Sequence, residues 1–293
     1  MKKAKDDPAV SPRGIDTSVP NMARVYDSLL GGKDNFAADR IQAAKLIEFD
    51  PSLPGLVRQN REFVSRVVTW AAGQGIRQFL DLGAGLPTHP AVHETARQVI
   101  ATARVLYVDS DPVVVLHAQT LLAGPDGVTA VQADLAQPER VMSRQTLGDL
   151  LDPAEPMCVL IAAVFHFMSA EAARDLASRY ARLLAPGSVL AVSVFGSDDP
   201  EVAEQARQAY TATRTYTHSR EDVASFLTGA GFELVEPGVV LAHAWRGDMP
   251  DPGPSLTGPL RVLAAVGILA PAAVFGETYS SFAISGIDRL VGR

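Results

Sequence analysis

Two aspartates and two glycines lie at the ends of neighbouring apolar segments, in an order that suits the binding of a nucleoside. Asp81 interrupts the apolar run that begins at Phe79, and Gly83 and Gly85 follow it before a helical pattern starts. Strand, glycine turn and helix together let the backbone approach a ligand closely and present unpaired N–H groups. Asp109 ends the next apolar run, close to the separation of roughly 20 residues expected of a carboxylate that reaches ribose hydroxyls in a βαβ unit.

The residues after the second glycine discriminate between ligands. The dinucleotide fingerprint has a third glycine where this chain has Thr88, which follows Pro87. A pyrophosphate would lack the third glycine that lets the backbone approach it, and the Asp81 carboxylate would repel it. The same carboxylate would attract a cationic amino group. The pattern favours S-adenosylmethionine, which joins adenosine to an aminoacyl tail. An NAD-dependent oxidoreductase and a purely structural tight turn are the alternatives.

Candidate groups for proton transfer follow the later predicted strands. His166 comes directly after the most apolar segment, residues 157–164, where the transferred group should point. An imidazole near its ordinary pKa would serve there as a general base at neutral pH. The two phenylalanines that flank His166 make simple packing the alternative. Tyr216 and His218 lie in a polar loop after the fifth predicted strand, where acceptors commonly approach.

Composition limits the classes of function. The chain has 293 residues, 47% of them hydrophobic, and a net charge of −7, which argues against sequence-independent nucleic-acid binding. Its one cysteine, Cys158, lies in an apolar run, so we expect a buried thiol, no disulfide framework, no metal cluster and a cytoplasmic location. The N-terminus lacks the apolar core of a signal peptide, and the tract 262–275 is too short to span a membrane.

Strands and helices that alternate along the middle of the chain predict a mostly parallel, doubly wound sheet with helices on both faces. The sequence predicts strands near 79–82, 104–108, 127–133, 157–164 and 188–195. It predicts intervening helices from about 91 onward and near 112–122, 169–184 and 200–210, and helical or mixed structure over 138–151. Three further helices, near 21–30, 36–49 and 53–72, precede the first strand. We therefore expect a disordered tail (1–14), a helical cap over the mouth of the site (15–75) and an α/β domain (76–293).

The C-terminal part has weaker signals. A capping box at Ser219 and Asp222 predicts a short helix over 223–227. Strands are expected at 232–235 and 239–243, a loop at 247–259, a short apolar helix at 260–269 and a last strand at 281–287 that pairs antiparallel with 232–243.

A long and unusual block, Tyr26 to Asp39, closely resembles an actinobacterial family of S-adenosylmethionine-dependent methyltransferases that was long classed as a domain of unknown function. The similarity continues through the glycine turn, the segment ending at Asp109 and the sequence around His166, and it covers roughly residues 15–245. The resemblance implies a class I, Rossmann-like methyltransferase fold with a seven-stranded sheet and a helical N-terminal extension. The chain departs from the family pattern after about Trp245, so residues 245–277 form an atypical segment that suggests a lid or a dimer contact.

The resemblance also implies roles for individual residues. The methionine moiety would lie against Asp81, Gly83 and Gly85, the ribose against Asp109, and the adenine edge against Asp134 and Leu135. The other expected cofactor-binding residues are Lys33, Asn35, Pro87, Thr88, Ser110 and Ala163, and the expected catalytic residues are His166, Tyr26 and Tyr216. The block with Tyr26, Lys33 and Asn35 would close over the cofactor; alternatively, it only fixes the turn between two helices.

These observations predict a methyltransferase that uses S-adenosylmethionine to methylate a small molecule by in-line displacement at the sulfonium. A non-catalytic sensor or scaffold that binds S-adenosylmethionine or S-adenosylhomocysteine is the alternative. No nucleic-acid or membrane partner is expected, and a homodimer is possible.

Overall fold

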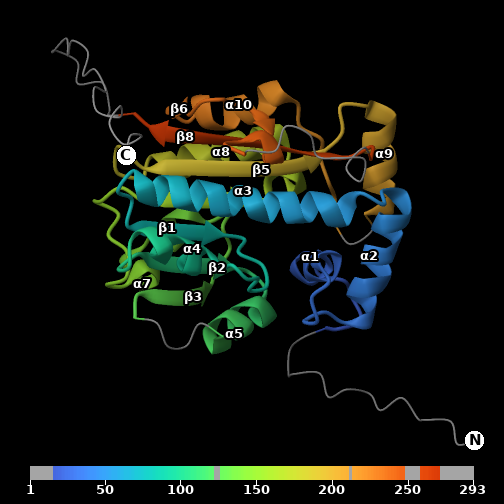
Figure 1. Ribbon diagram of the computed structural model, residues 1–293, viewed down its shortest axis with the longest axis horizontal. Helices are drawn as coiled ribbons and strands as arrows, with labels where there is room; N and C mark the ends of the chain where they lie inside the picture. The colour runs from blue at the N-terminus through green and yellow to red at the C-terminus, as the bar shows by residue number, and fades with distance from the viewer. Residues whose placement is uncertain (1–15, 122–125, 211–212, 248–257, 271–293) are drawn as a thin grey trace, which may run out of the picture.

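A computed structural model describes residues 16–121, 126–210, 213–247 and 258–270 of the chain. One mixed sheet runs through the molecule, and helices cover both of its faces (Figure 1). The strands are β1 (Gln78–Leu82), β2 (Arg104–Asp109), β3 (Val128–Gln132), β4 (Cys158–Ala162), β5 (Val189–Gly196), β6 (Phe232–Leu234), β7 (Val240–Leu241) and β8 (Arg261–Leu269). The helices are α1 (Met22–Leu30), α2 (Ala37–Phe49), α3 (Leu53–Gly73), α4 (Val92–Val99), α5 (Pro112–Leu121), α6 (Pro138–Val141), α7 (Arg144–Leu147), α8 (Ala170–Ala181), α9 (Pro200–Ala209) and α10 (Arg220–Thr228), with 3-10 turns η1 (Phe165–Phe167) and η2 (Ala242–Ala244).

The strand order confirms the predicted class I methyltransferase fold. The order is β3-β2-β1-β4-β5-β8-β6, in which β1 to β5 are parallel and β8 lies antiparallel between β5 and β6. The two-residue strand β7 also pairs with β8, so the sheet has eight strands where seven were expected. Because β4 and β5 follow β1 on the opposite side from β2, the carboxyl ends of β1 and β4 flank the point where the strand order reverses, which is where ligands bind in such sheets.

The prediction of a helix at 260–269 is wrong, since this segment forms β8. Its run of valine, leucine and alanine is buried throughout and pairs along its length with β5. Periodicity alone cannot distinguish a short buried strand from a buried helix. The predicted strand at 281–287 and the predicted tail at 1–14 lie outside the described residues. The helical or mixed structure expected at 138–151 is the pair of short helices α6 and α7.

Local capping explains where several helices begin and end. The Asn21 side chain accepts hydrogen bonds from the first turn of α1, and Gly31, in the left-handed conformation, ends that helix. Asp111 accepts a hydrogen bond from the Val113 amide at the start of α5. The capping box predicted at Ser219 begins α10.

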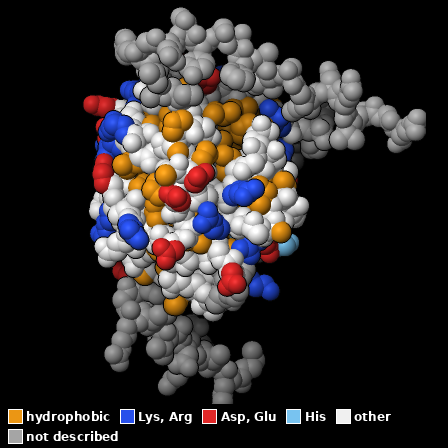
Figure 2. Space-filling view, turned by 90° about the vertical axis from the view of Figure 1, so that its left-hand side faces the viewer, with side chains coloured by type: hydrophobic (Ala, Val, Ile, Leu, Met, Phe, Trp, Pro, Cys, Tyr) orange, Lys and Arg blue, Asp and Glu red, His pale blue; other side chains and the backbone are white. Residues whose placement is uncertain are grey.

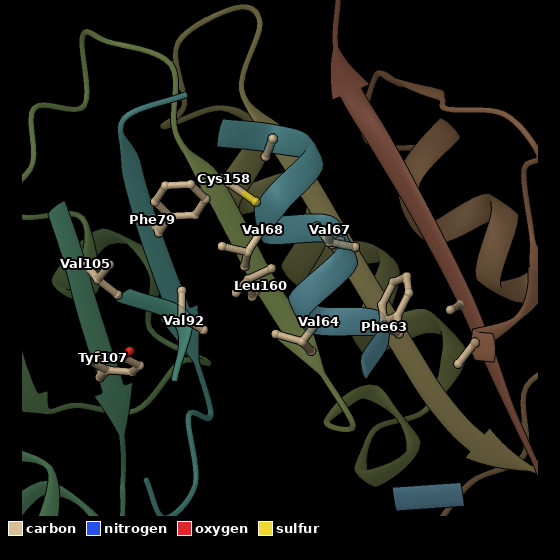
Figure 3. Packing of buried hydrophobic residues seen from close by; sticks show 14 of the residues in the cluster. Phe63, Val64, Val67, Val68, Phe79, Val92, Val105, Tyr107, Cys158 and Leu160 are labelled. Carbon is tan, nitrogen blue, oxygen red and sulfur yellow. The ribbon is translucent and has the colours of Figure 1, made fainter. Parts of the chain in front are cut away.

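Helix α3 packs directly on the sheet, so the N-terminal helices are more than a cover for the site. Its apolar face, with Phe63, Val64 and Val68, contacts one buried layer that also contains Phe79 and Cys158 (Figure 3). Residues of α1, α2, α4 and α5 belong to the same layer. The second buried layer, on the other face, joins the sheet to α6, α7, α8 and α10. The hydrophobic core is therefore continuous between residues 15–75 and the α/β part of the chain.

The face on the left-hand side of Figure 1, away from α1, α2 and α9, carries acidic and basic side chains that are interspersed (Figure 2). None of the helices in the described ranges is both long enough and apolar enough to cross a bilayer.

Candidate functional site

A cavity of about 360 Å³ lies at the carboxyl ends of β1, β2, β4 and β5 and is enclosed by α1, α2, α3 and α9. Its wall contains eleven of the residues expected from the sequence, namely Tyr26, Asp81, Gly83, Gly85, Thr88, Asp109, Ser110, Leu135, Ala163, His166 and Tyr216. Pro87 lines a smaller adjoining cavity that shares Asp81, Gly85 and Thr88 with the main one. The chain thus brings together, from helix α1 and from strand ends, turns and loops, most of the residues that the sequence singled out.

The glycine turn after β1 approaches the end of β2 through main-chain contacts. Gly83 and Gly85 have φ values of 70° and 65°, which glycine adopts without strain. A Cβ atom on Gly83 would lie 2.8 Å from a methyl group of Val164, so a larger residue would not fit there. The amide of Gly85 donates a hydrogen bond of 2.9 Å to the Asp109 carboxylate. The turn is thereby fixed with its backbone facing the cavity.

Asp109 accepts main-chain hydrogen bonds on both carboxylate oxygens. One oxygen binds the Gly85 amide and the other binds the Asp111 amide at 2.9 Å. Burial raises the pKa of the Asp109 carboxyl above its ordinary value, and these two amides oppose the rise. The carboxylate links two loops and still lines the cavity, so it can accept hydrogen bonds from a vicinal diol as well.

Asp81 is 6% exposed, and within the described ranges its carboxylate receives no hydrogen bond. Burial raises the pKa of the Asp81 carboxyl from 3.8 to about 6; the Arg61 guanidinium opposes this rise and Asp109 adds to it. A buried carboxylate that lacks hydrogen-bond donors is costly and gains most from a cationic ligand. The Asp81 carboxylate beside the glycine turn therefore has the chemistry to bind an ammonium group.

Arg61 is a wall residue that the sequence reasoning missed. It extends from α3 to the glycine turn, where its Nη2 atom donates to the carbonyl groups of Thr88 and Pro90 at 3.4 Å each. A signal was available, because Arg61 interrupts the apolar face of α3 between Val57 and Val64 at helical spacing. With Asp81 it places one cation and one anion side by side, as the two ends of an amino acid require.

A chain of hydrogen bonds fixes the floor of the cavity. The Tyr26 hydroxyl donates to the Val57 carbonyl and accepts from Asn60 Nδ2, both at 3.0 Å. The Ser193 hydroxyl donates to Asn60 Oδ1 at 2.5 Å and accepts from the Ala163 amide at 2.9 Å. Ala163 has a φ of 57°, which is unusual for alanine. Because the Tyr26 proton is already donated and burial raises the pKa of this phenol, Tyr26 holds α1 against α3 and has no proton to exchange in this arrangement.

His166 lines the cavity from the turn after β4. It is 7% exposed, and its Nδ1 atom has no hydrogen-bond partner within the described part of the chain. Burial, with a smaller contribution from His218, lowers the pKa of the His166 imidazole to about 3. This corrects the expectation of a near-ordinary pKa: the imidazole is neutral at physiological pH and disfavours taking up a proton. It remains a good hydrogen-bond partner for an acceptor molecule.

Tyr216 is positioned by a main-chain bond from its amide to the His166 carbonyl, at 2.8 Å. His218 lies behind the wall, where its Nε2 atom is 3.0 Å from the Phe165 carbonyl and its ring packs against Phe226. His218 is therefore a packed residue behind the wall.

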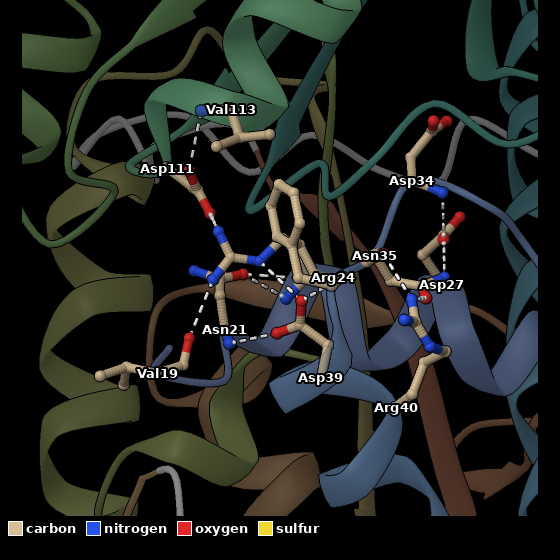
Figure 4. Close-up of polar contacts among 12 residues, drawn as sticks. Val19, Asn21, Arg24, Asp27, Asp34, Asn35, Asp39, Arg40, Asp111 and Val113 are labelled. Carbon is tan, nitrogen blue, oxygen red and sulfur yellow. Dashed lines mark hydrogen bonds and ion pairs between the residues drawn. The ribbon is translucent and has the colours of Figure 1, made fainter. Parts of the chain in front are cut away.

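Three of the expected cofactor-binding residues lie away from the cavity wall. Lys33 is exposed, and Asn35 donates through Nδ2 to the Asp27 carboxylate at 2.7 Å (Figure 4). Asp134 is exposed and accepts from the Ala136 amide in the turn after β3. Asp27 itself lines the cavity, so Asn35 contributes by orienting a wall residue.

A buried ion-pair network joins the N-terminal helices to the loop after β2 (Figure 4). Arg24 lies 3.0 Å from the Asp39 carboxylate on α2 and 3.7 Å from the Asp111 carboxylate at the start of α5. Its guanidinium also donates to the Val19 carbonyl. Asp111 thus has two contacts, since it also accepts the hydrogen bond from the Val113 amide that caps α5.

The comparisons with known proteins agree with this geometry. A family model described as S-adenosyl methyltransferase matches residues 8–270. The chain belongs to this family. The match continues beyond Trp245 and includes β8, so the expectation that the chain departs from the family pattern there is wrong.

Two crystal structures resemble the chain over most of its length. One is a Thermobifida fusca protein with a provisional methyltransferase assignment, 34% identical, with a TM-score of 0.81 over 90% of this chain and 100% of the other. The other is a Streptomyces avermitilis protein of the DUF574 family, 33% identical, with a TM-score of 0.79 over 87% and 99% of the two chains. A Parafrankia protein provisionally named an S-adenosyl-L-methionine-dependent methyltransferase is 30% identical over 181 residues, which are 60% of this chain and 53% of that protein. The chain thus matches about half the length of this relative.

Proposed function

We propose that this member of the S-adenosyl methyltransferase family transfers the methyl group of S-adenosylmethionine to a small-molecule acceptor in the cavity described above. The observation that supports this most strongly is the buried Asp81 carboxylate, which receives no hydrogen bond from the described residues and shares the cavity wall with Arg61. This pair suits the ammonium and carboxylate groups of the methionine moiety.

In this proposal Asp81 binds the ammonium group, Arg61 the carboxylate and Asp109 the ribose hydroxyls. The backbone of Gly83 and Gly85 lies close to the ligand, as their conformations allow. The other wall residues Thr88, Ser110, Leu135 and Ala163 complete the adenosyl site, with Pro87 behind them. Lys33, Asn35 and Asp134 act at most indirectly, through the loops that they fix.

The bound sulfonium supplies the reactive methyl group. The chain supplies orientation and excludes water, because the cavity wall is mostly apolar and holds donor and acceptor in contact. The neutral His166 forms a hydrogen bond that orients the acceptor. As the bond from the methyl group to the acceptor forms, the carbon–sulfur bond breaks and the proton that the acceptor loses passes to bulk water, because His166, with a pKa of about 3, does not retain it. Tyr216 belongs to the same wall and contributes contact surface.

The alternatives receive less support. No observation on the molecule favours a non-catalytic sensor or scaffold over an enzyme. An NAD-dependent oxidoreductase is disfavoured because Asp81 lies where a pyrophosphate would pass, next to Pro87 and Thr88. Homodimer formation and a cytoplasmic location remain predictions from the sequence.

Isothermal titration calorimetry with S-adenosylhomocysteine tests the proposal. We expect micromolar binding to the parent protein and a loss of at least tenfold in Asp81→Asn and Asp109→Asn. Asp134→Asn is the matched control, since it is an exposed carboxylate after a neighbouring strand and should bind like the parent. Absence of heat with the parent protein at millimolar ligand, or unchanged binding in the first two variants, would refute the proposal.

A further inference from the structure

We infer that the part of the cavity beyond His166 is an acceptor site for an uncharged, planar aromatic molecule that carries a hydroxyl or N–H group. This inference rests on the proposed function, because it treats the glycine-turn side of the cavity as occupied by S-adenosylmethionine.

The distribution of charge divides the cavity into two parts. The carboxylate and guanidinium groups of its described wall belong to Asp27, Arg61, Asp81 and Asp109. Asp81 and Asp109 lie on β1 and β2, and Arg61 lies beside Asp81. Asp27 is on the same side. Its carboxylate accepts a hydrogen bond from the Asp34 amide, and the Asp34 carboxylate lies 3.7 Å from His117 on α5, the helix that follows β2. All four charges therefore surround the proposed cofactor site.

The remaining wall, formed by η1, β5, α2 and α9, presents no carboxylate, ammonium or guanidinium group among its described residues. A ligand carboxylate or phosphate there would lose its hydration without a compensating charge. The wall therefore selects against charged acceptors.

Aromatic rings line this uncharged part on one side. The His166 ring lies 4.1 Å from the Phe167 ring and 5.5 Å from the Phe195 ring, measured between centroids. Tyr210, at the end of α9, lies 5.9 Å from Phe167. These rings come from η1, β5 and α9, and all four residues line the cavity. Clustered ring faces and edges favour a flat aromatic partner, which can stack or pack edge-to-face with them.

Aliphatic side chains and small residues form the opposite side. Leu46 and Leu53 project from the N-terminal helices, and Ala203 and Ala206 face the cavity from α9. The two alanines leave room that larger side chains would fill. Gln42 of α2 donates a hydrogen bond of 2.8 Å to the Ala209 carbonyl, so α2 and α9 close this end together.

In the uncharged part of the cavity, called the chamber below, the polar side chain of His166 would orient a ligand. The Nδ1 atom of His166 is fully buried and unpaired within the described residues, so Nε2 is the ring nitrogen that a ligand in the cavity can reach. A neutral imidazole that carries its proton on Nδ1 accepts a hydrogen bond at Nε2. An acceptor hydroxyl or N–H group that donates to the imidazole would lie at the border between the aromatic rings and the cofactor site. This is where a methylated oxygen or nitrogen must be.

The test uses the parent protein saturated with S-adenosylhomocysteine and two pairs of probes, 2-naphthol against 2-naphthoate and indole against indole-3-carboxylate, at pH 7.5. Within each pair the rings are the same and only one probe is charged. We expect calorimetry to show at least tenfold tighter binding of the neutral probe in at least one pair. In Ala206→Trp, which fills the chamber, that binding should be lost while S-adenosylhomocysteine still binds. Gln205→Trp, with the same side chain on the exposed side of α9, is the matched control and should bind the probe like the parent.

The outcomes separate this inference from the proposed function. If S-adenosylhomocysteine does not bind to the parent protein, both are wrong. If it binds but the charged probes bind as well as the neutral ones, or neither kind binds, the assignment of the acceptor class is wrong and the proposed function stands. If Ala206→Trp retains the probe, or loses S-adenosylhomocysteine together with it, the chamber is not where the inference locates it.

Discussion

Replacing Asp81 by asparagine should stabilise the ligand-free protein and at the same time abolish its affinity for S-adenosylhomocysteine. The Asp81 carboxyl has an ordinary pKa of 3.8, which burial raises to about 6 in the folded chain. Because the folded state holds this proton more tightly than the unfolded state, the group favours folding fully only below about pH 4. That contribution is lost as the pH rises through 6. Asparagine, which is neutral and of similar size, removes this dependence.

The magnitude follows from the pKa. A rise from 3.8 to about 6 corresponds to about 3 kcal/mol of unfolding free energy at pH 7.5, at about 1.4 kcal/mol per pKa unit. Urea unfolding of Asp81→Asn and the parent at pH 4 and pH 7.5 measures it. We expect nearly equal stabilities at pH 4 and an advantage of about 2–3 kcal/mol for the variant at pH 7.5. Asp134→Asn, at an exposed carboxylate, should differ little from the parent at either pH.

The same measurement repeated with saturating S-adenosylhomocysteine should reverse the order, because the ligand stabilises only the protein that binds it. The reasoning is refuted if Asp81→Asn is no more stable than the parent at pH 7.5 without ligand. It is also refuted if the stabilities of the two proteins change in parallel between pH 4 and pH 7.5, since Asp81 would then not titrate in this range.

Three further substitutions test other parts of the site. Arg61→Met should weaken S-adenosylhomocysteine binding about 10- to 100-fold in calorimetry, at about 1.4–3 kcal/mol for a charge-assisted hydrogen bond, with little change in melting temperature. Gly83→Ala should lower stability by about 1–3 kcal/mol in urea unfolding because its φ is 70° and its Cβ would clash, whereas Gly73→Ala, in open space, should be neutral or slightly stabilising. Arg24→Met should lower stability by about 3–5 kcal/mol by leaving a buried carboxylate unpaired, whereas Arg207→Met, on the exposed side of α9, should lose less than about 1 kcal/mol. Equal effects within either matched pair, or unaltered binding in Arg61→Met, would contradict the corresponding structural argument.

The parallel part of the fold could be predicted because its signals are local. The apolar runs, the glycine turn and the capping residues each determine a few neighbouring bonds, and the expected strands and helices between residues 79 and 210 are present. The segment 261–269 is different, since its run of six buried residues fits a strand or a helix equally well and only the long pairing with β5 decides between them. Such non-local pairing leaves no trace in the sequence of the segment itself.

The site shows the same division. Asp81 and Asp109 could be found because strand ends and glycine turns can be recognised along the chain. Arg61 could not be placed, because α3 is brought to the glycine turn only by tertiary packing. The direction in which the Asp134 side chain points, away from the cavity, is set by its own turn and not by its position after a strand. The low pKa of the His166 imidazole is caused mainly by its burial, which a sequence does not show.

The double role of α3 limits how this protein can change. Within one short stretch of α3, Asn60 and Arg61 line the cavity, Phe63 packs in the core against the sheet, and Val64 does both. Mutations in this stretch that change ligand binding should therefore also change the packing of α3 on the sheet, so we expect this helix to tolerate few substitutions. Helix α9 has no fully buried side chain and still faces the chamber. New substrate preferences should accordingly arise, in nature or in the laboratory, by exchange of residues on α9.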